Sequence, residues 1–186
     1  KRVENDEEWT LMSEHQCPGL SNVYGDEFEK LYTKYENEQK NLEKIKARDL
    51  MSKIIEAQIE TGQPYMLYKD SINNKSNQKN IGVIKSSNLC AEIVEYSDKN
   101  ETSVCNLASI ALPKFVKKTD KKLSYDYQAL YETAKLATKN LDEVIDINFY
   151  PTDKTERSNN KHRPIGLGIQ GLADVYFKLG IGYETE

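Results

Sequence analysis

The stretch SNLCAE (residues 87–92) is the most informative part of the sequence. β-Branched residues and near-alternation of apolar and polar side chains over residues 81–96 favour an extended conformation. Side chains two residues apart in an extended chain lie on one face, so Asn88, Cys90 and Glu92 are expected to share a face. An amide, a thiol and a carboxylate would then lie within about 7 Å along the strand. Together these groups can orient a hydroxyl, react at carbon and accept a proton.

A second thiol lies a short distance further along the chain. Cys105 opens an apolar run, and residues 104–112 are suited to a buried strand or a short helix that ends at Pro113. Because Asn-x-Cys-x-Glu is a short pattern, a buried cysteine beside ordinary strand residues is its commonest explanation. The surrounding sequence has to decide between that explanation and a reactive thiol.

Apolar residues at helical spacing predict four helices. The first begins at Asp26, a suitable N-cap, and the second ends at Gly62. The longest precedes Pro151, and the last has Gly180 as its C-cap. Residues 64–68 and 163–169 are expected to be extended, and residues 71–80 to be a polar loop. The apolar stripes of the four helices lie at residues 28–35, 50–59, 127–145 and 172–179.

Composition limits the class of protein. The 186 residues include 26 Lys and Arg against 30 Asp and Glu, for a net charge of −4, and 38% of residues are hydrophobic. This mixture is typical of a soluble, surface-rich segment. No run approaches the roughly 18 apolar residues of a membrane span, and no signal peptide is visible. The acidic balance argues against nucleic acid as a partner.

The remaining compositional signals concern redox state and completeness. Cys17, Cys90 and Cys105 are the three cysteines, an odd number that indicates reduced thiols in the cytoplasm rather than a disulfide scaffold. Because the first residue is Lys1 and the apolar content is lean for an independent core, a segment of a larger protein is expected. The mixed helical and extended patterns predict an α/β fold, with residues 1–186 as one partial domain.

Two further patterns resemble known binding motifs but lack features that those motifs need. Residues 166–171 match G-x-G-x-x-G, but a dinucleotide-binding loop needs an apolar strand before it and an acidic residue about 20 positions later. Basic residues 161–163 precede this motif, so close strand–helix packing is the favoured interpretation. His15 and His162 could join the cysteines at a metal ion, but no C-x-x-C or H-x-x-x-H spacing is present, and no metal site is expected.

Six stretches of the sequence are informative when they are considered together. They are WTLM (residues 9–12), CPGL (17–20), YMLYKDS (65–71), SNLCAEIVEY (87–96), VCNLASIAL (104–112) and HRPIGLGIQGLAD (162–174). In this order they resemble the large, catalytic subunit of class I ribonucleotide reductases, in particular its eukaryotic and large-DNA-virus branch. The resemblance extends over nearly the whole chain and implies an internal segment of that family's ten-stranded α/β barrel, including the finger loop with the active-site cysteine.

The resemblance implies a reaction and assigns roles in it. The family reduces ribonucleoside diphosphates to deoxyribonucleoside diphosphates. By similarity, Cys90 would become a thiyl radical and take the 3′ hydrogen, Glu92 would accept the proton of the 3′ hydroxyl, and Asn88 would hydrogen-bond the sugar hydroxyls. Cys105 would be one of two reducing thiols that end as a disulfide. The substrate site would be lined by Asn88, Leu89, Cys90, Ala91 and Glu92.

The resemblance also implies partners beyond this chain. A metal-bearing small subunit would generate the radical, thioredoxin or glutaredoxin would restore the thiols, and ATP and deoxynucleoside triphosphates would act as effectors in the cytoplasm. No cofactor is expected in this chain itself. The second reducing cysteine, the ATP-binding cone and the C-terminal tail are expected in the remaining large-subunit segments, so the isolated chain should be inactive.

Three alternatives stay open at this point. The chain could be a non-catalytic, reductase-derived interaction module, one piece of a split enzyme, or an ordinary thiol–disulfide protein. The joint presence of Asn88, Cys90, Glu92 and Cys105 argues against the first, because packing alone would tolerate Ser or Ala at these positions. The last lacks the close cysteine pair and cationic surroundings that lower the pKa of a thiol.

Overall fold

The computed structural model describes residues 1–120 and 122–185. It divides into two compact units, Lys1–Ser97 and Asp98–Glu186, and each is described here by itself. The expectation of one partial domain stays a prediction. Among the described residues, no helix is long and apolar enough to cross a bilayer.

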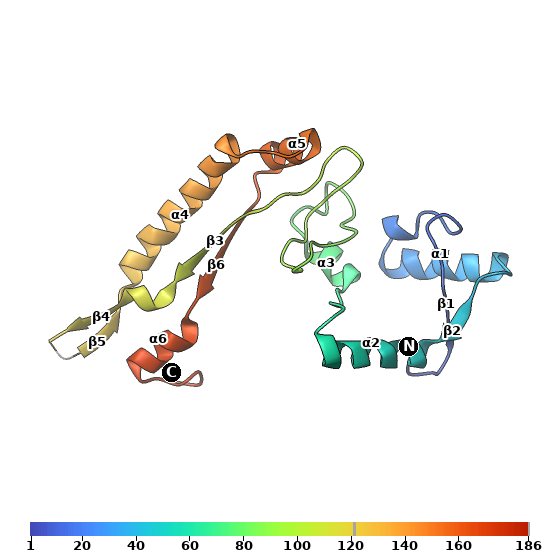
Figure 1. Cartoon of the computed structure of the whole chain (residues 1–186), viewed down its shortest axis with the longest axis horizontal. Coiled ribbons are helices and arrows are strands. Elements are labelled where there is room, and N and C mark those ends of the chain that lie inside the picture. Colours follow the sequence, from blue (N-terminus) through green and yellow to red (C-terminus); the bar gives the residue numbers. More distant parts are fainter. Residues whose placement is uncertain (121, 186) are drawn as a thin grey trace. The chain divides into compact units, whose positions relative to one another are not determined.

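The N-terminal unit combines one small antiparallel sheet with helices (Figure 1). Strand β1 (Glu8–Thr10) pairs with β2 (Lys44–Lys46), and the 3-10 turn η1 (Leu20–Asn22) and helix α1 (Gly25–Glu38) connect them. Helix α2 (Ala47–Thr61) follows β2 directly and is followed by α3 (Lys69–Lys75). The predicted stop of α2 is confirmed, because Gly62 adopts a left-handed φ of 76° and its N–H donates to Gln58.

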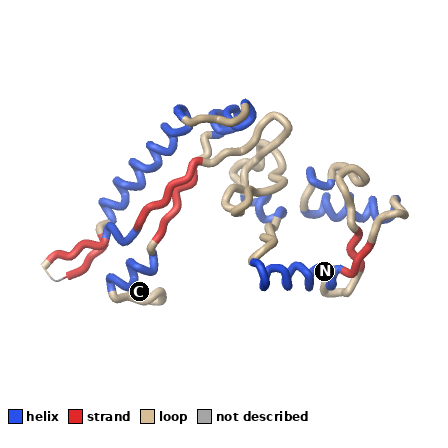
Figure 2. Tube along the Cα trace, in the orientation of Figure 1, coloured by secondary structure: helices blue, strands red, loops and turns tan. Residues whose placement is uncertain are grey.

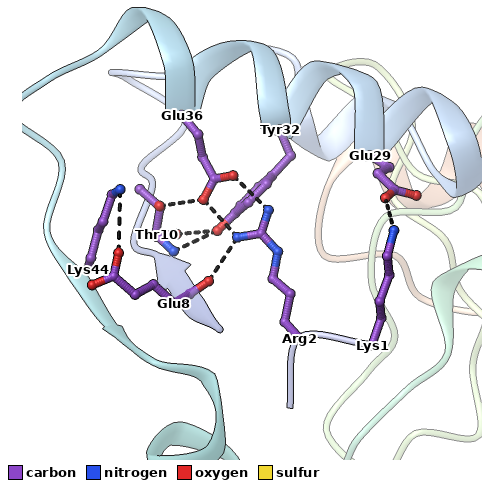
Figure 3. Close-up of polar contacts among 8 residues, drawn as sticks. All are labelled: Lys1, Arg2, Glu8, Thr10, Glu29, Tyr32, Glu36 and Lys44. Carbon is purple, nitrogen blue, oxygen red and sulfur yellow. Dashed lines mark hydrogen bonds and ion pairs between the residues drawn. The ribbon is translucent and has the colours of Figure 1, made fainter. Parts of the chain in front are cut away.

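A partly buried polar cluster joins the start of the chain to β1 and α1 (Figure 3). The Arg2 guanidinium binds the Glu36 carboxylate with two hydrogen bonds of 2.8 and 2.6 Å, and it lies over the Tyr32 ring at 4.9 Å from the ring centroid. The Thr10 hydroxyl donates to Glu36 over 2.6 Å, and the Tyr32 hydroxyl donates to the Thr10 carbonyl over 2.8 Å. The hydrogen-bonded guanidinium holds the pKa of Glu36 below its usual value.

The C-terminal unit is centred on two parallel strands, β3 (Asn106–Ala111) and β6 (Ile165–Gln170) (Figure 2). Their register pairs Asn106 with Ile165 and Ala111 with Gln170. Parallel neighbours need a long crossover connection, and here the crossover contains helix α4 (Tyr127–Ile147), which packs along both strands (Figure 1). The crossover also holds η2 (Leu112–Phe115), the antiparallel pair β4 (Val116–Thr119) and β5 (Lys122–Tyr125), and α5 (Asp153–His162).

The two ends of β6 are held by specific residues. Before the strand, Arg163 ends α5 in a left-handed conformation and binds Asp142 and Asp146 of α4 over 2.7 and 2.8 Å. After it, Gly171 has a φ of 76° and begins α6 (Leu172–Leu179). A Cβ atom at Gly171 would lie 2.7 Å from the Pro113 ring, so only glycine fits both the backbone conformation and the contact.

The local predictions succeed for all four expected helices and fail for several short segments. Helices α1, α2, α4 and α6, the last with its Gly180 C-cap, are confirmed. Of the residues 163–169 expected to be extended, 165–169 lie in β6, whereas Arg163 is left-handed and caps α5. Asp26 is not the N-cap of α1; Tyr24 is, and Asp26 lies in the first turn, where a carboxylate favours the helix dipole. Residues 71–80 are not wholly a loop, because α3 reaches Lys75. Helix α5 and strands β1, β2, β4 and β5 were not anticipated.

Replacement of Glu36 by Gln should destabilise the N-terminal unit in a pH-dependent way. A folded-state pKa below the ordinary value means that the ion pair stabilises the fold above about pH 4.5 and that this stabilisation is lost as the pH falls further. We expect Glu36→Gln to lower the free energy of unfolding by about 1–3 kcal/mol at pH 7, with the difference from wild type shrinking in acid. Denaturant titrations of the intact protein at several pH values measure it.

Glu38→Gln is the matched control, because Glu38 is on the same helix and pairs with Lys34 at 4.0 Å on an exposed surface. Its effect should stay below about 0.5 kcal/mol at every pH. Equal effects of the two substitutions would contradict the role given to the partly buried cluster.

Candidate active site

The loop at residues 87–93 is organised by the side chain of Asn88. Its amide nitrogen donates to the Glu92 carboxylate over 2.6 Å, and its amide oxygen accepts from the Ile93 N–H over 3.0 Å. The Asn88 carbonyl accepts from the Ala91 N–H over 3.3 Å and closes a turn. Ser87 completes the loop, since its hydroxyl donates to the Ile93 carbonyl over 2.5 Å.

The expected extended conformation of this loop is wrong. Ala91 has a left-handed φ of 67°, and residues 81–96, all of which the structure describes, contain no strand. The shared face of Asn88, Cys90 and Glu92 is therefore not produced by strand alternation. Instead, a turn places the Glu92 carboxylate beside the Asn88 amide. Cys90 lies at the tip of this turn, between the two residues in sequence.

Cys90 is exposed at this tip, and its neighbour Leu89 is 87% exposed. The nearby carboxylate of Glu92 is held by the Asn88 amide while keeping a second oxygen for another partner. A thiol, a carboxylate and an amide are thus presented on one short turn. These groups could bind a hydroxyl-bearing ligand and accept a proton beside an exposed thiol.

Cys105 lies immediately before β3 in the C-terminal unit and is half-buried. Its sulfur lies near Gly166 of the neighbouring strand, where an added Cβ atom would lie 3.5 Å from the sulfur but only 2.5 Å from the Leu107 side chain. The loop with Cys90 belongs to the N-terminal unit. The structure thus brings Asn88 and Glu92 together around Cys90, while the grouping of Cys90 with Cys105 stays a prediction.

The other residues weighed at the sequence level have different positions. Cys17 is completely buried, and burial raises the pKa of its thiol, as in an inert core cysteine. Among the residues that the structure describes, no group of three or more His, Cys, Asp and Glu could hold a metal ion. The first two glycines of residues 166–171 lie within β6 rather than in a loop after it, which agrees with the packing interpretation of this motif.

Sequence reasoning missed two features near the candidate thiols. Ser87 was not singled out, although Ser and Asn commonly bond the backbone of a following turn and could have indicated one here. The buried carboxylate of Glu101 was also missed. It binds Lys161 and His162, about sixty residues further along the chain, and no local pattern indicates so distant a contact.

Comparison with known proteins identifies the family of this chain. The family model of the ribonucleotide reductase barrel domain matches residues 1–186. The chain is 54% identical to a ribonucleoside-diphosphate reductase large subunit of Plasmodium falciparum and 55% identical to one of Acanthamoeba polyphaga mimivirus. It is 56% identical to the large chain 2 of Saccharomyces cerevisiae. Each alignment covers 100% of this chain but only 21–23% of the relative.

These comparisons define a class of protein: a mixed helix-and-sheet segment of a reductase barrel. The chain belongs to the ribonucleotide reductase barrel-domain family. It spans between a fifth and a quarter of the length of the relatives it matches.

Removal of the Asn88 side chain should loosen the loop. In Asn88→Ala the Ile93 N–H loses its acceptor, and one lost hydrogen bond of about 1 kcal/mol corresponds to roughly fivefold faster amide exchange. Hydrogen–deuterium exchange at Ile93 measures the change. Asn74→Ala, at an exposed position of α3, is the control and should leave Ile93 unaffected. Unchanged exchange at Ile93 in Asn88→Ala would show that another group fixes the loop.

Proposed function

We propose that this chain is the part of a ribonucleoside-diphosphate reductase large subunit that performs hydrogen abstraction and supplies one reducing thiol. The observation that carries the proposal is the turn that holds the Glu92 carboxylate on Asn88, with Cys90 exposed between them. Membership of the reductase barrel family over the whole chain supports it. On this proposal, residues 88–92 form the tip of the finger loop inside the family's ten-stranded barrel.

The proposed chemistry begins at Cys90. An oxidant outside this chain, the metal-bearing small subunit, removes the thiol hydrogen atom and leaves a thiyl radical. The Cys90 sulfur then takes the hydrogen atom from the 3′ carbon of a ribonucleoside diphosphate, so an S–H bond forms as the C–H bond breaks. Glu92 accepts the proton of the 3′ hydroxyl, and the Asn88 amide keeps the carboxylate in place for this transfer.

Cys105 takes part in the reduction that follows. It acts with a second thiol from the remaining segments of the large subunit. The two thiols supply two protons and two electrons and end as a disulfide. One hydrogen leaves with the 2′ hydroxyl as water and the other is retained on the 2′ carbon. Cys90 then returns its hydrogen atom to the 3′ carbon, which restores the thiyl radical and closes the cycle.

The partners of the complete enzyme follow from the same proposal. Thioredoxin or glutaredoxin would reduce the disulfide, and ATP and deoxynucleoside triphosphates would bind as effectors on parts of the large subunit outside this chain. We place the enzyme in the cytoplasm, where a reduced thiol pool keeps Cys90 and Cys105 available.

Serine substitutions separate the two proposed thiol roles. In the assembled enzyme, Cys90→Ser should abolish both release of tritium from 3′-tritiated substrate and formation of deoxynucleotide, because no thiyl radical can form. Cys105→Ser should still release tritium but should stall before the product. Both activities are measured with dithiothreitol as reductant, with Cys17→Ala as the control at a buried thiol outside the proposed site.

Substantial turnover by Cys90→Ser would show that the radical is assigned to the wrong residue. Absence of both deoxynucleotide formation and tritium release in the unsubstituted, assembled enzyme would favour a non-catalytic module instead.

A further inference from the structure

The segment that leads into Cys105 is fastened to helix α5 before the cysteine is reached. The Thr102 N–H donates to the Lys154 carbonyl over 3.2 Å, and the Arg157 guanidinium donates to the Asn100 carbonyl over 2.8 Å. Asp98 shapes the preceding turn by accepting from the N–H groups of residues 100 and 101. The backbone of residues 100–102 is therefore held along one side of α5.

Glu101 makes the strongest of these attachments. Its side chain is only 9% exposed, and each carboxylate oxygen has its own partner: Lys161 at 2.5 Å and the Nε2 atom of His162 at 2.7 Å. Both partners belong to the last turn of α5. A buried carboxylate is costly without such partners. Separation of residues 100–102 from α5 would therefore expose the Glu101 carboxylate or leave it buried without a partner.

A second attachment lies just beyond the cysteine. The Asn106 side chain donates to the amide oxygen of Asn159 over 3.3 Å, and Asn159, which is completely buried on α5, donates to the Tyr150 hydroxyl over 2.6 Å. Cys105 thus lies between two points of attachment to α5, at Glu101 and at Asn106. On its other side the Cys105 sulfur lies near Gly166 of β6, where an added Cβ atom would lie 3.5 Å from it, an ordinary contact distance.

We propose that α5 positions Cys105 for the reductive step, with Glu101 as the principal positioning residue. This inference rests on the proposed function, which makes Cys105 a reducing thiol. Glu101 does not touch the sulfur or the substrate in this account. It acts through the backbone of residues 101–105, whose position decides where the thiol meets the reacting sugar. A displacement of about 1 Å in such a group can cost roughly a hundredfold in rate.

The test is a coupling ratio measured in the assembled enzyme with the full-length large subunit. The ratio compares tritium released to water from 3′-tritiated substrate with deoxynucleotide formed. Glu101→Gln should raise this ratio about tenfold or more, because hydrogen abstraction by Cys90 continues while reduction through a displaced Cys105 fails. Substitution that merely lowers the fraction of folded enzyme reduces both quantities together and leaves their ratio unchanged.

Two further variants accompany the test: Glu143→Gln is a control, and Lys161→Met tests the same attachment through its other partner. Glu143→Gln removes a carboxylate from an exposed pair with Lys139 at 3.6 Å and should leave the ratio unchanged. Lys161→Met removes one partner of Glu101 at a side chain that is 57% exposed, so it spares the buried interior and should raise the ratio in the same direction, by less. If Glu101→Gln does not fold, the result with Lys161→Met decides.

The outcomes separate this inference from the proposed function. An unchanged ratio in Glu101→Gln, or in Lys161→Met where Glu101→Gln does not fold, would overturn the positioning role while leaving the reductase function intact. No deoxynucleotide formation by the unsubstituted, assembled enzyme would overturn the proposed function and this inference with it. A raised ratio in the Glu101 or Lys161 variant, with Glu143→Gln unchanged, supports the inference.

Discussion

The parallel register between β3 and β6 is the constraint on which the C-terminal unit depends. Pairing Asn106 with Ile165 places the residue before β3, Cys105, beside Gly166 on the neighbouring strand. Because parallel strands cannot be joined by a short turn, a long crossover must connect them, and here it contains α4 and α5. Helix α5 therefore ends where β6 begins, close to the start of β3, and its side chains can reach both flanks of Cys105.

In the N-terminal unit, the loop at residues 84–96 is ordered without pairing to a neighbouring strand. Three backbone N–H groups of this loop donate to side-chain amide oxygens: Ile84 to Asn73, Ile93 to Asn88 and Tyr96 to Gln78. These amides supply the partners that a neighbouring strand would supply in a sheet. The loop can then bend sharply at Ala91 and carry Cys90 at its tip, which a regular strand would not allow.

This difference explains which features could be predicted from the sequence. Helices α1, α2, α4 and α6 have their determinants in contiguous residues, above all an apolar stripe, and all four were recognised. Residues 81–96 have the composition of a strand, but long-range side-chain bonds decide their conformation. The proximity of Asn88 and Glu92 was expected and is confirmed by their hydrogen bond, although a turn rather than a strand produces it. Glu101 could not be found, because its partners are about sixty residues away.

The central claim is that the two thiols have different tasks: Cys90 transfers hydrogen and Cys105 is oxidised. The most direct measurement is to let the full-length large subunit turn over with its small subunit in the absence of external reductant, alkylate the remaining thiols and map each cysteine by mass spectrometry. The account predicts that Cys105 enters a disulfide in proportion to the deoxynucleotide formed, while Cys90 and Cys17 are recovered as alkylated thiols. Recovery of Cys90 in a disulfide, or of alkylated Cys105 after product has formed, would contradict it.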